Sequence, residues 1–134
     1  MGDMLDELRR VLEADPDIAY ALLFGSGGRG TLSPTSDVDV AVELRRGAPH
    51  DTATLGQLAA RLESATGRRV DLVLMDEAPA PLAYRIFRDG RVVLERDHAA
   101  LVWRKAQAIL QYLDFKPVEE LCAEGVLRAA ARRG

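Results

Sequence analysis

A glycine-rich turn between two regular segments most constrains how this chain can fold. Residues 18–24 form a short, continuous apolar run, which is typical of a central strand covered on both faces. Gly25 and Ser26 follow this run directly, and Asp37 and Asp39 open the next regular segment after ten intervening residues. We therefore expect the glycine turn at the carboxyl end of a buried strand, with two aspartates near the start of the next strand.

The two segments after this turn predict strands that carry aspartates on one face. Residues 37–44 alternate between two sets of side chains, so Asp37 and Asp39 should emerge on the same strand face, about 6.5 to 7 Å apart. Residues 69–75 repeat this arrangement, with Asp71 beside the start of an apolar strand. Two neighbouring strands are therefore expected to bring three carboxylates close together.

The rest of the chain predicts helices around a small sheet. Apolar periodicity and turn residues predict helices over 3–14, 51–66, 82–88, 97–113 and 118–132, and an edge strand over 91–95. Strands separated by a loop and by helices indicate an α/β (α+β) fold with a small mixed β-sheet flanked by helices. A length of 134 residues suits one domain, 1–134, with 97–134 as C-terminal helices.

Composition restricts the classes of partner and compartment. The net charge of −3 gives no strong indication of nucleic-acid binding. No apolar run approaches the roughly 20 residues that span a bilayer, and the acidic N-terminus is no secretory signal. The one cysteine, Cys122, cannot form an internal disulfide, which fits a reducing cytoplasm.

Three carboxylates at one place are chemically suited to a divalent cation. Asp37, Asp39 and Asp71 offer the oxygen ligands that Mg²⁺ prefers, and two-metal sites hold their ions about 3.5 to 4 Å apart. Without a cation, such carboxylates repel one another and their pKa values rise. Nucleotidyl transfer depends mainly on positioning and charge neutralisation, so this ligand set predicts metal-assisted chemistry of that kind.

The glycine turn is suited to phosphate. Glycines let backbone N–H groups approach phosphate oxygens, Ser26 adds a hydroxyl donor, and Arg29 is placed to pair with a triphosphate. A glycine turn after a strand, or Asp-x-Asp at a strand end, is common when it occurs alone, and the combination of both is more specific. The turn is neither a Walker A loop nor a Rossmann fingerprint.

The combined pattern resembles a known family. Gly25-Ser26, ten residues and then an Asp-x-Asp resemble the signature of the DNA polymerase beta-type nucleotidyltransferase superfamily. The Arg-Gly of the loop and the Val-Asp-Leu-Val around Asp71 resemble its minimal nucleotidyltransferase (MNT) branch, over roughly residues 8 to 95. Residues 85–97, with Asp89-Gly90, resemble MntA-type antitoxins, which are encoded beside a HEPN-domain RNase toxin.

The resemblance implies a role for each matching residue. Asp37 and Asp39 would hold two Mg²⁺ ions, and Asp71 would complete the metal site and help to deprotonate the attacking hydroxyl. Gly25 and Ser26 would hold the β- and γ-phosphates of ATP. The implied reaction transfers AMP to a tyrosine hydroxyl of the HEPN toxin and so silences its RNase activity.

Three other functions stay open at this point. In the first, AMP is transferred to a small molecule, although the chain has no second domain to shape a pocket for one. In the second, it is transferred to a nucleic acid 3′ end, although the chain has no basic surface to bind nucleic acid. In the third, the chain is a non-catalytic antitoxin that only covers the toxin. One departure from the family is Gly27-Gly28, where relatives often carry a larger residue and an alanine; none of the three aspartates is lost.

Overall fold

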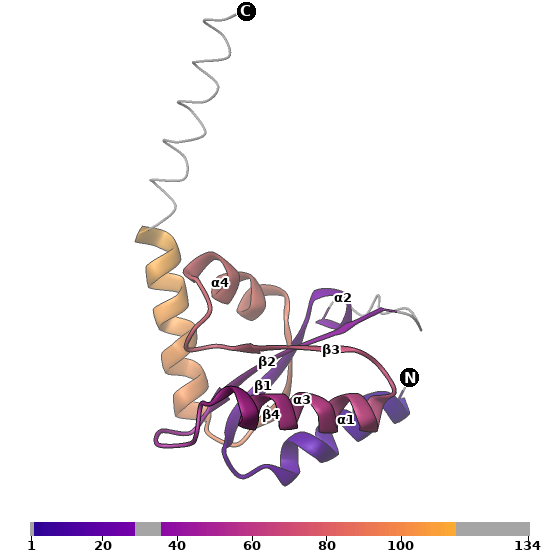
Figure 1. Ribbon diagram of the computed structural model, residues 1–134. Helices are drawn as coiled ribbons and strands as arrows, with labels where there is room; N and C mark the ends of the chain where they lie inside the picture. Colours follow the sequence, from indigo (N-terminus) through magenta and orange to yellow (C-terminus); the bar gives the residue numbers. More distant parts are fainter. Residues whose placement is uncertain (1, 29–35, 115–134) are drawn as a thin grey trace, which may run out of the picture.

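The computed structural model describes residues 2–28 and 36–114 of the chain, which form a mixed four-stranded sheet with helices on both faces (Figure 1). The elements are α1 (Gly2–Ala14), β1 (Ile18–Phe24), α2 (Gly25–Gly28), β2 (Val38–Leu44), α3 (Thr52–Thr66), β3 (Val70–Leu74), α4 (Ala80–Asp89) and β4 (Arg91–Glu95), followed by a helix over 98–114. The strand order is β3-β2-β1-β4. β1 runs antiparallel to β2 and β4, whereas β2 and β3 are parallel. The predicted α+β class and the edge position of residues 91–95 are confirmed.

Alternation along β2 divides the core between the two faces of the sheet. Val38, Val40 and Val42 pack in a cluster with side chains of α1 and α3. Ala41 belongs to a second cluster with side chains of α4 and of helix 98–114. β1 is buried from Ile18 through Leu23, as its continuous apolar run predicts for a strand covered on both faces.

Local signals explain where α3 begins and ends. The Asp51 side chain accepts a hydrogen bond from the Thr54 backbone N–H at 3.3 Å and so caps the first turn. Gly67 ends the helix with φ of 68°, in the left-handed region that glycine adopts without steric cost. The crossover through α3 is what places β3 parallel to β2.

Two predictions differ from the structure in detail. β2 begins at Val38, so Asp37 lies just before the strand and not in it. The sequence places Val102, Ala106, Ile109 and Leu113 on one apolar stripe of the C-terminal helix. This stripe faces outward, because Leu101 and Ala108 on the other side of the helix fill the core. The predicted helix over 118–132 falls outside the residues that the structure describes. None of the helices within residues 2–28 and 36–114 combines the length and apolar character needed to cross a membrane.

Candidate active site

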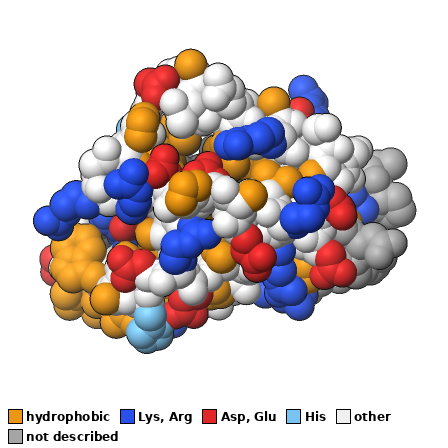
Figure 2. Space-filling model, turned by 90° about the horizontal axis from the view of Figure 1, so that it is seen from below, with side chains coloured by type: hydrophobic (Ala, Val, Ile, Leu, Met, Phe, Trp, Pro, Cys, Tyr) orange, Lys and Arg blue, Asp and Glu red, His pale blue; other side chains and the backbone are white. Residues whose placement is uncertain are grey.

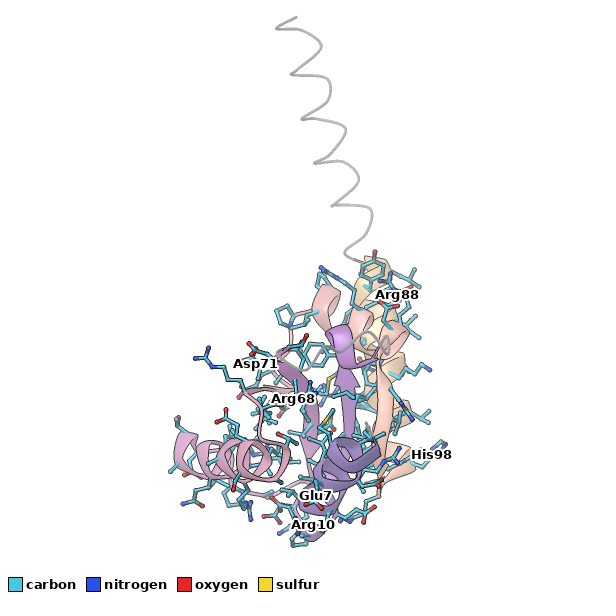
Figure 3. The ribbon with its side chains drawn as sticks, turned by 90° about the vertical axis from the view of Figure 1, so that its right-hand side faces the viewer. Glu7, Arg10, Arg68, Asp71, Arg88 and His98 are labelled. Carbon is cyan, nitrogen blue, oxygen red and sulfur yellow. The ribbon has the colours of Figure 1, made fainter. Side chains whose placement is uncertain are left out.

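Two of the predicted aspartates lie side by side on the sheet. Asp39 of β2 and Asp71 of β3 are register partners in the parallel pair, and adjacent strands are about 4.8 Å apart. Because register partners point to the same face, both carboxylates lie on the face that α4 and helix 98–114 cover further along. Figure 3 shows Asp71 near the α2 end of the sheet and His98 far from it.

The electrostatics of Asp39 indicate a crowded carboxylate pair. Burial raises the pKa of Asp39, and the negative charges of Asp71 and Asp37 and a side-chain hydrogen bond with Asp71 raise that pKa further. Asp37 and Asp71 are exposed, whereas Asp39 is half-buried. The structure thus brings Asp39 and Asp71 together, with Asp37 close enough for its charge to act on Asp39.

Gly25 lies directly against the Asp39 carboxylate. It follows Phe24, the β1 register partner of Asp39, and adopts φ of 61°. A Cβ atom built on Gly25 would stand 2.4 Å from Asp39 Oδ2, which is far closer than real Cβ contacts. The backbone of the turn can approach the aspartate this closely only with glycine at this position.

The α2 turn is held in place by the end of α4. A Cβ on Gly28 would lie 2.8 Å from the Leu23 carbonyl oxygen and 3.0 Å from that of Asp89. Gly90 is equally restricted, since its Cβ would lie 2.2 Å from the Ile86 carbonyl oxygen. Asp89-Gly90 was identified from the sequence only as part of the resemblance over residues 85–97, and its contact with α2 was missed. The Asp-Gly sequence could have indicated a tight turn here, but it does not show which other element the turn contacts.

We expect Gly28→Ala to lower the free energy of unfolding by about 1 to 3 kcal/mol, because its neighbours are backbone atoms that must shift. Gly56→Ala is the matched control, since Gly56 lies inside α3 with open space around its Cβ position. That control should raise the free energy of unfolding by about 0.5 to 1 kcal/mol. Urea unfolding measures both, and equal stability of the two variants would contradict the packing of α2 on α4.

The three aspartates have the right chemistry to bind a divalent cation, but their side chains are not arranged as a complete metal site. Within residues 2–28 and 36–114, no three His, Cys, Asp or Glu side chains are arranged so that they could hold a metal ion as they stand. Carboxylate oxygens are the donors that Mg²⁺ prefers, and a cation would relieve the repulsion around Asp39. The assignment of Asp37, Asp39 and Asp71 as metal ligands stays a prediction. So does that of Ser26 and Arg29 as nucleotide ligands, because the Ser26 side chain and Arg29 fall outside the described part of the chain.

A pocket of roughly 740 Å³ lies at the opposite end of β2 and lacks all three aspartates. Glu43, only 13% exposed, lies at this end. Its Oε1 accepts hydrogen bonds from the Tyr20 hydroxyl at 2.9 Å and from Arg104 Nε at 2.8 Å. His50, also on the pocket wall, pairs with Asp76 at 3.5 Å. These groups are satisfied by one another, so the pocket does not replace the aspartate pair as the candidate site.

The model of the family described as "Polymerase beta, Nucleotidyltransferase" matches residues 6–99, well over half of the chain. No curated protein sequence matches the chain. The family match runs from within α1 to just beyond β4 and includes Gly25, Asp39 and Asp71.

Solved structures share the fold over nearly the whole chain. A toxin-antitoxin crystal structure with AMP-PNP has a TM-score of 0.77 at 23% identity, covering 92% of this chain and 98% of that chain. The toxin-antitoxin MntA-HepT has a TM-score of 0.73 at 20% identity, covering 95% and 99% of the two chains. A tri-AMPylated Shewanella oneidensis HEPN toxin in complex with MNT antitoxin has a TM-score of 0.72 at 21% identity, covering 92% and 96%. At these identities the likeness shows a shared fold.

Proposed function

Because the chain belongs to the polymerase beta nucleotidyltransferase family, we propose that it is an antitoxin that transfers AMP from ATP to a hydroxyl of a HEPN-domain toxin. The observation that carries the proposal is the Asp39–Asp71 pair directly beside Gly25. A phosphate held by the glycine turn would lie next to carboxylates that bind cations. This juxtaposition is what nucleotidyl transfer requires.

Each residue of the site has a role in the proposed reaction. Asp37, Asp39 and Asp71 would hold two Mg²⁺ ions, and Asp71 would also help to deprotonate the attacking hydroxyl. When bound, Mg²⁺ neutralises charge on the phosphates. Gly25 presents its backbone to the β- and γ-phosphates. The raised pKa of Asp39 in the metal-free chain supports this role, because a group crowded by like charges gains most from a bound cation.

The acceptor is proposed from the structural neighbours. One neighbour is a complex that contains a tri-AMPylated HEPN toxin, and another contains AMP-PNP, an ATP analogue. We place the transferred AMP on a tyrosine hydroxyl of the toxin, and the reaction in the cytoplasm. The RNase activity of the toxin is then lost because its side chain carries the added nucleotide.

The test is to incubate the purified chain with ATP, Mg²⁺ and the HEPN protein of the neighbouring reading frame, and to measure the intact mass of that protein. We expect an increase by one or more AMP units, with pyrophosphate released in equal amount. Asp37→Asn/Asp39→Asn should add none, and so should the native chain when EDTA removes Mg²⁺.

Other outcomes would replace the proposal. An unmodified toxin that is nevertheless silenced by the double variant would show an antitoxin that acts by binding alone. Transfer of AMP to an aminoglycoside or to an RNA 3′ end, with no transfer to the HEPN protein, would assign a different acceptor.

A further inference from the structure

Helix 98–114 exposes apolar side chains on the side that faces away from the core. We call this surface the outer stripe, which consists of Val102, Trp103, Ala106, Ile109, Leu110 and Leu113. Trp103 is 56% exposed and Leu110 is 57% exposed. The opposite side of the same helix buries Leu101 and Ala108. A helix that is apolar on two opposite sides normally has a partner on each.

The spacing of the outer stripe suits a helical partner. At 100° per residue its six members fall within about one third of the helix circumference, over a length of roughly 17 Å. Trp103, Ala106, Leu110 and Leu113 follow the alternating three- and four-residue steps of a helix-packing seam. Figure 2 shows hydrophobic side chains gathered at the left edge of the molecule, where this helix lies.

Trp103 is held in a defined position despite its exposure. The Arg104 guanidinium lies over its ring, 4.9 Å from the centroid. Arg104 is fixed in turn by Glu43, which also accepts a hydrogen bond from the fully buried Tyr20. An exposed tryptophan braced by a buried network has the composition and preorganisation of a binding anchor.

We propose that the outer stripe is the docking surface for an amphipathic helix of the protein that accepts AMP. This inference rests on the proposed function for the identity of the partner. Contact at the stripe would hold the acceptor against the chain, so that delivery of its hydroxyl to Asp39 and Asp71 becomes an intramolecular step.

The position of the stripe relative to the site suits such a partner. Helix 98–114 is joined to α4 by the stacked rings of Tyr84 and Tyr112, whose centroids are 4.0 Å apart. The C-terminal end of α4, at Asp89, contacts the α2 turn at Gly28. Tyr84 lies in the middle of α4, five residues before Asp89, so the partner must pass around helix 98–114 and then along about half of α4, roughly 8 Å. A domain of about 100 residues, with a radius of gyration near 13 Å, is large enough.

The area of the stripe argues against a second copy of this chain as its occupant. Six partly exposed apolar side chains offer on the order of 400 Å². A stable interface buries about 800 Å² on each partner, so two stripes packed together would supply roughly half of what a dimer needs. An acceptor that also contacts the active site gains the remaining area there.

Trp103 gives a direct readout, because it is the only tryptophan in the chain. The chain is labelled with 5-fluorotryptophan and carries Asp37→Asn/Asp39→Asn, so that binding is observed without AMP transfer. We expect the ¹⁹F resonance to show a solvent-exposed ring in the free chain at every concentration. Addition of the HEPN protein of the neighbouring reading frame should shield the ring.

A matched pair of variants tests whether the stripe carries the affinity. Leu110→Glu and Gln111→Glu add the same charge at adjacent exposed positions, but only the first lies on the stripe. We expect Leu110→Glu to weaken binding about 30-fold or more, and Gln111→Glu to change it by less than about threefold. Trp103→Ala should weaken binding about tenfold or more, which guards against a folding defect in a single variant.

Three results would contradict the proposed docking surface. The first is that Leu110→Glu and Gln111→Glu bind the HEPN protein with equal affinity. The second is a Trp103 ring that is already shielded in the dilute free chain, and the third is shielding of that ring that grows with the concentration of the chain alone. The second would assign the stripe to the chain's own residues, and the third to a second copy. A native chain that docks through the stripe but transfers no AMP would instead refute the proposed function and leave the docking surface intact.

Discussion

Asp39→Asn is expected to abolish AMP transfer and at the same time to stabilise the metal-free protein. Loss of one metal-binding carboxylate should lower the rate about 10³-fold or more, because a bound metal ion contributes several kcal/mol to such reactions. Since the folded-state pKa of Asp39 is raised, its charged form destabilises the fold. The free energy of unfolding of the native chain should therefore fall as pH rises above the ordinary aspartate pKa of about 3.9 and through the raised value.

Thermal unfolding at neutral pH measures the second effect. The neutral amide of Asp39→Asn removes the destabilising charge, and we expect the free energy of unfolding to rise by roughly 0.5 to 1 kcal/mol after allowance for solvent screening. Asp6→Asn removes the same charge from an exposed position on α1 and should change stability by less than about 0.5 kcal/mol. Mg²⁺ should stabilise the native chain but not Asp39→Asn. A loss of stability in Asp39→Asn would contradict the crowded pair.

Gly25→Ala is expected to remove activity through a clash with the same aspartate. The new methyl group would meet Asp39 Oδ2, so either the turn or the carboxylate must leave its place. The left-handed backbone of Gly25 adds a cost of about 1 to 2 kcal/mol for any other residue. We expect the free energy of unfolding to fall by about 2 to 4 kcal/mol in all, and AMP transfer to fall about 10³-fold or more, as for loss of the carboxylate.

Gly67→Ala separates the backbone strain of Gly25→Ala from its clash. Gly67 has φ of 68°, close to the 61° of Gly25, but has open space around its Cβ position. Its substitution should cost about 1 to 2 kcal/mol and leave the rate of AMP transfer unchanged. If Gly25→Ala were as active as Gly67→Ala, the contact between the glycine turn and Asp39 would have no functional role.

The fold was largely predictable from the spacing of apolar residues and from the residues that form turns or end helices. The apolar run of β1 lies where the sequence predicted it, and the alternation of β2 begins within one residue of its predicted start. The predicted helix over 51–66 also matches α3 to within one residue. The direction in which helix 98–114 faces was not predictable. Its apolar residues surround the helix, and only packing decides that Leu101 and Ala108 meet the sheet while Trp103 does not.

The candidate site was predictable in its members but not in their arrangement. The pairing of Asp39 with Asp71 follows from a parallel register that the alternation alone does not determine. Asp37 lies outside β2, because the strand begins one residue later than its pattern suggested. The support of α2 by Asp89 and Gly90 depends on a contact between segments some 60 residues apart in the sequence, which no local pattern records.

The most direct test of AMP transfer is a turnover measurement of toxin silencing. The HEPN protein is incubated with Mg²⁺, ATP and a small fraction of its molar amount of this chain, and its RNase activity is followed with time. We expect nearly all of that activity to disappear, because each molecule of an enzyme modifies many acceptors. The same mixture with an α,β-methylene analogue of ATP should retain almost full RNase activity, because the carbon bridge between the α- and β-phosphates prevents AMP transfer. Silencing that never exceeds the molar amount of the chain, or that is equal with ATP and the analogue, would contradict catalysis at Asp39 and Asp71.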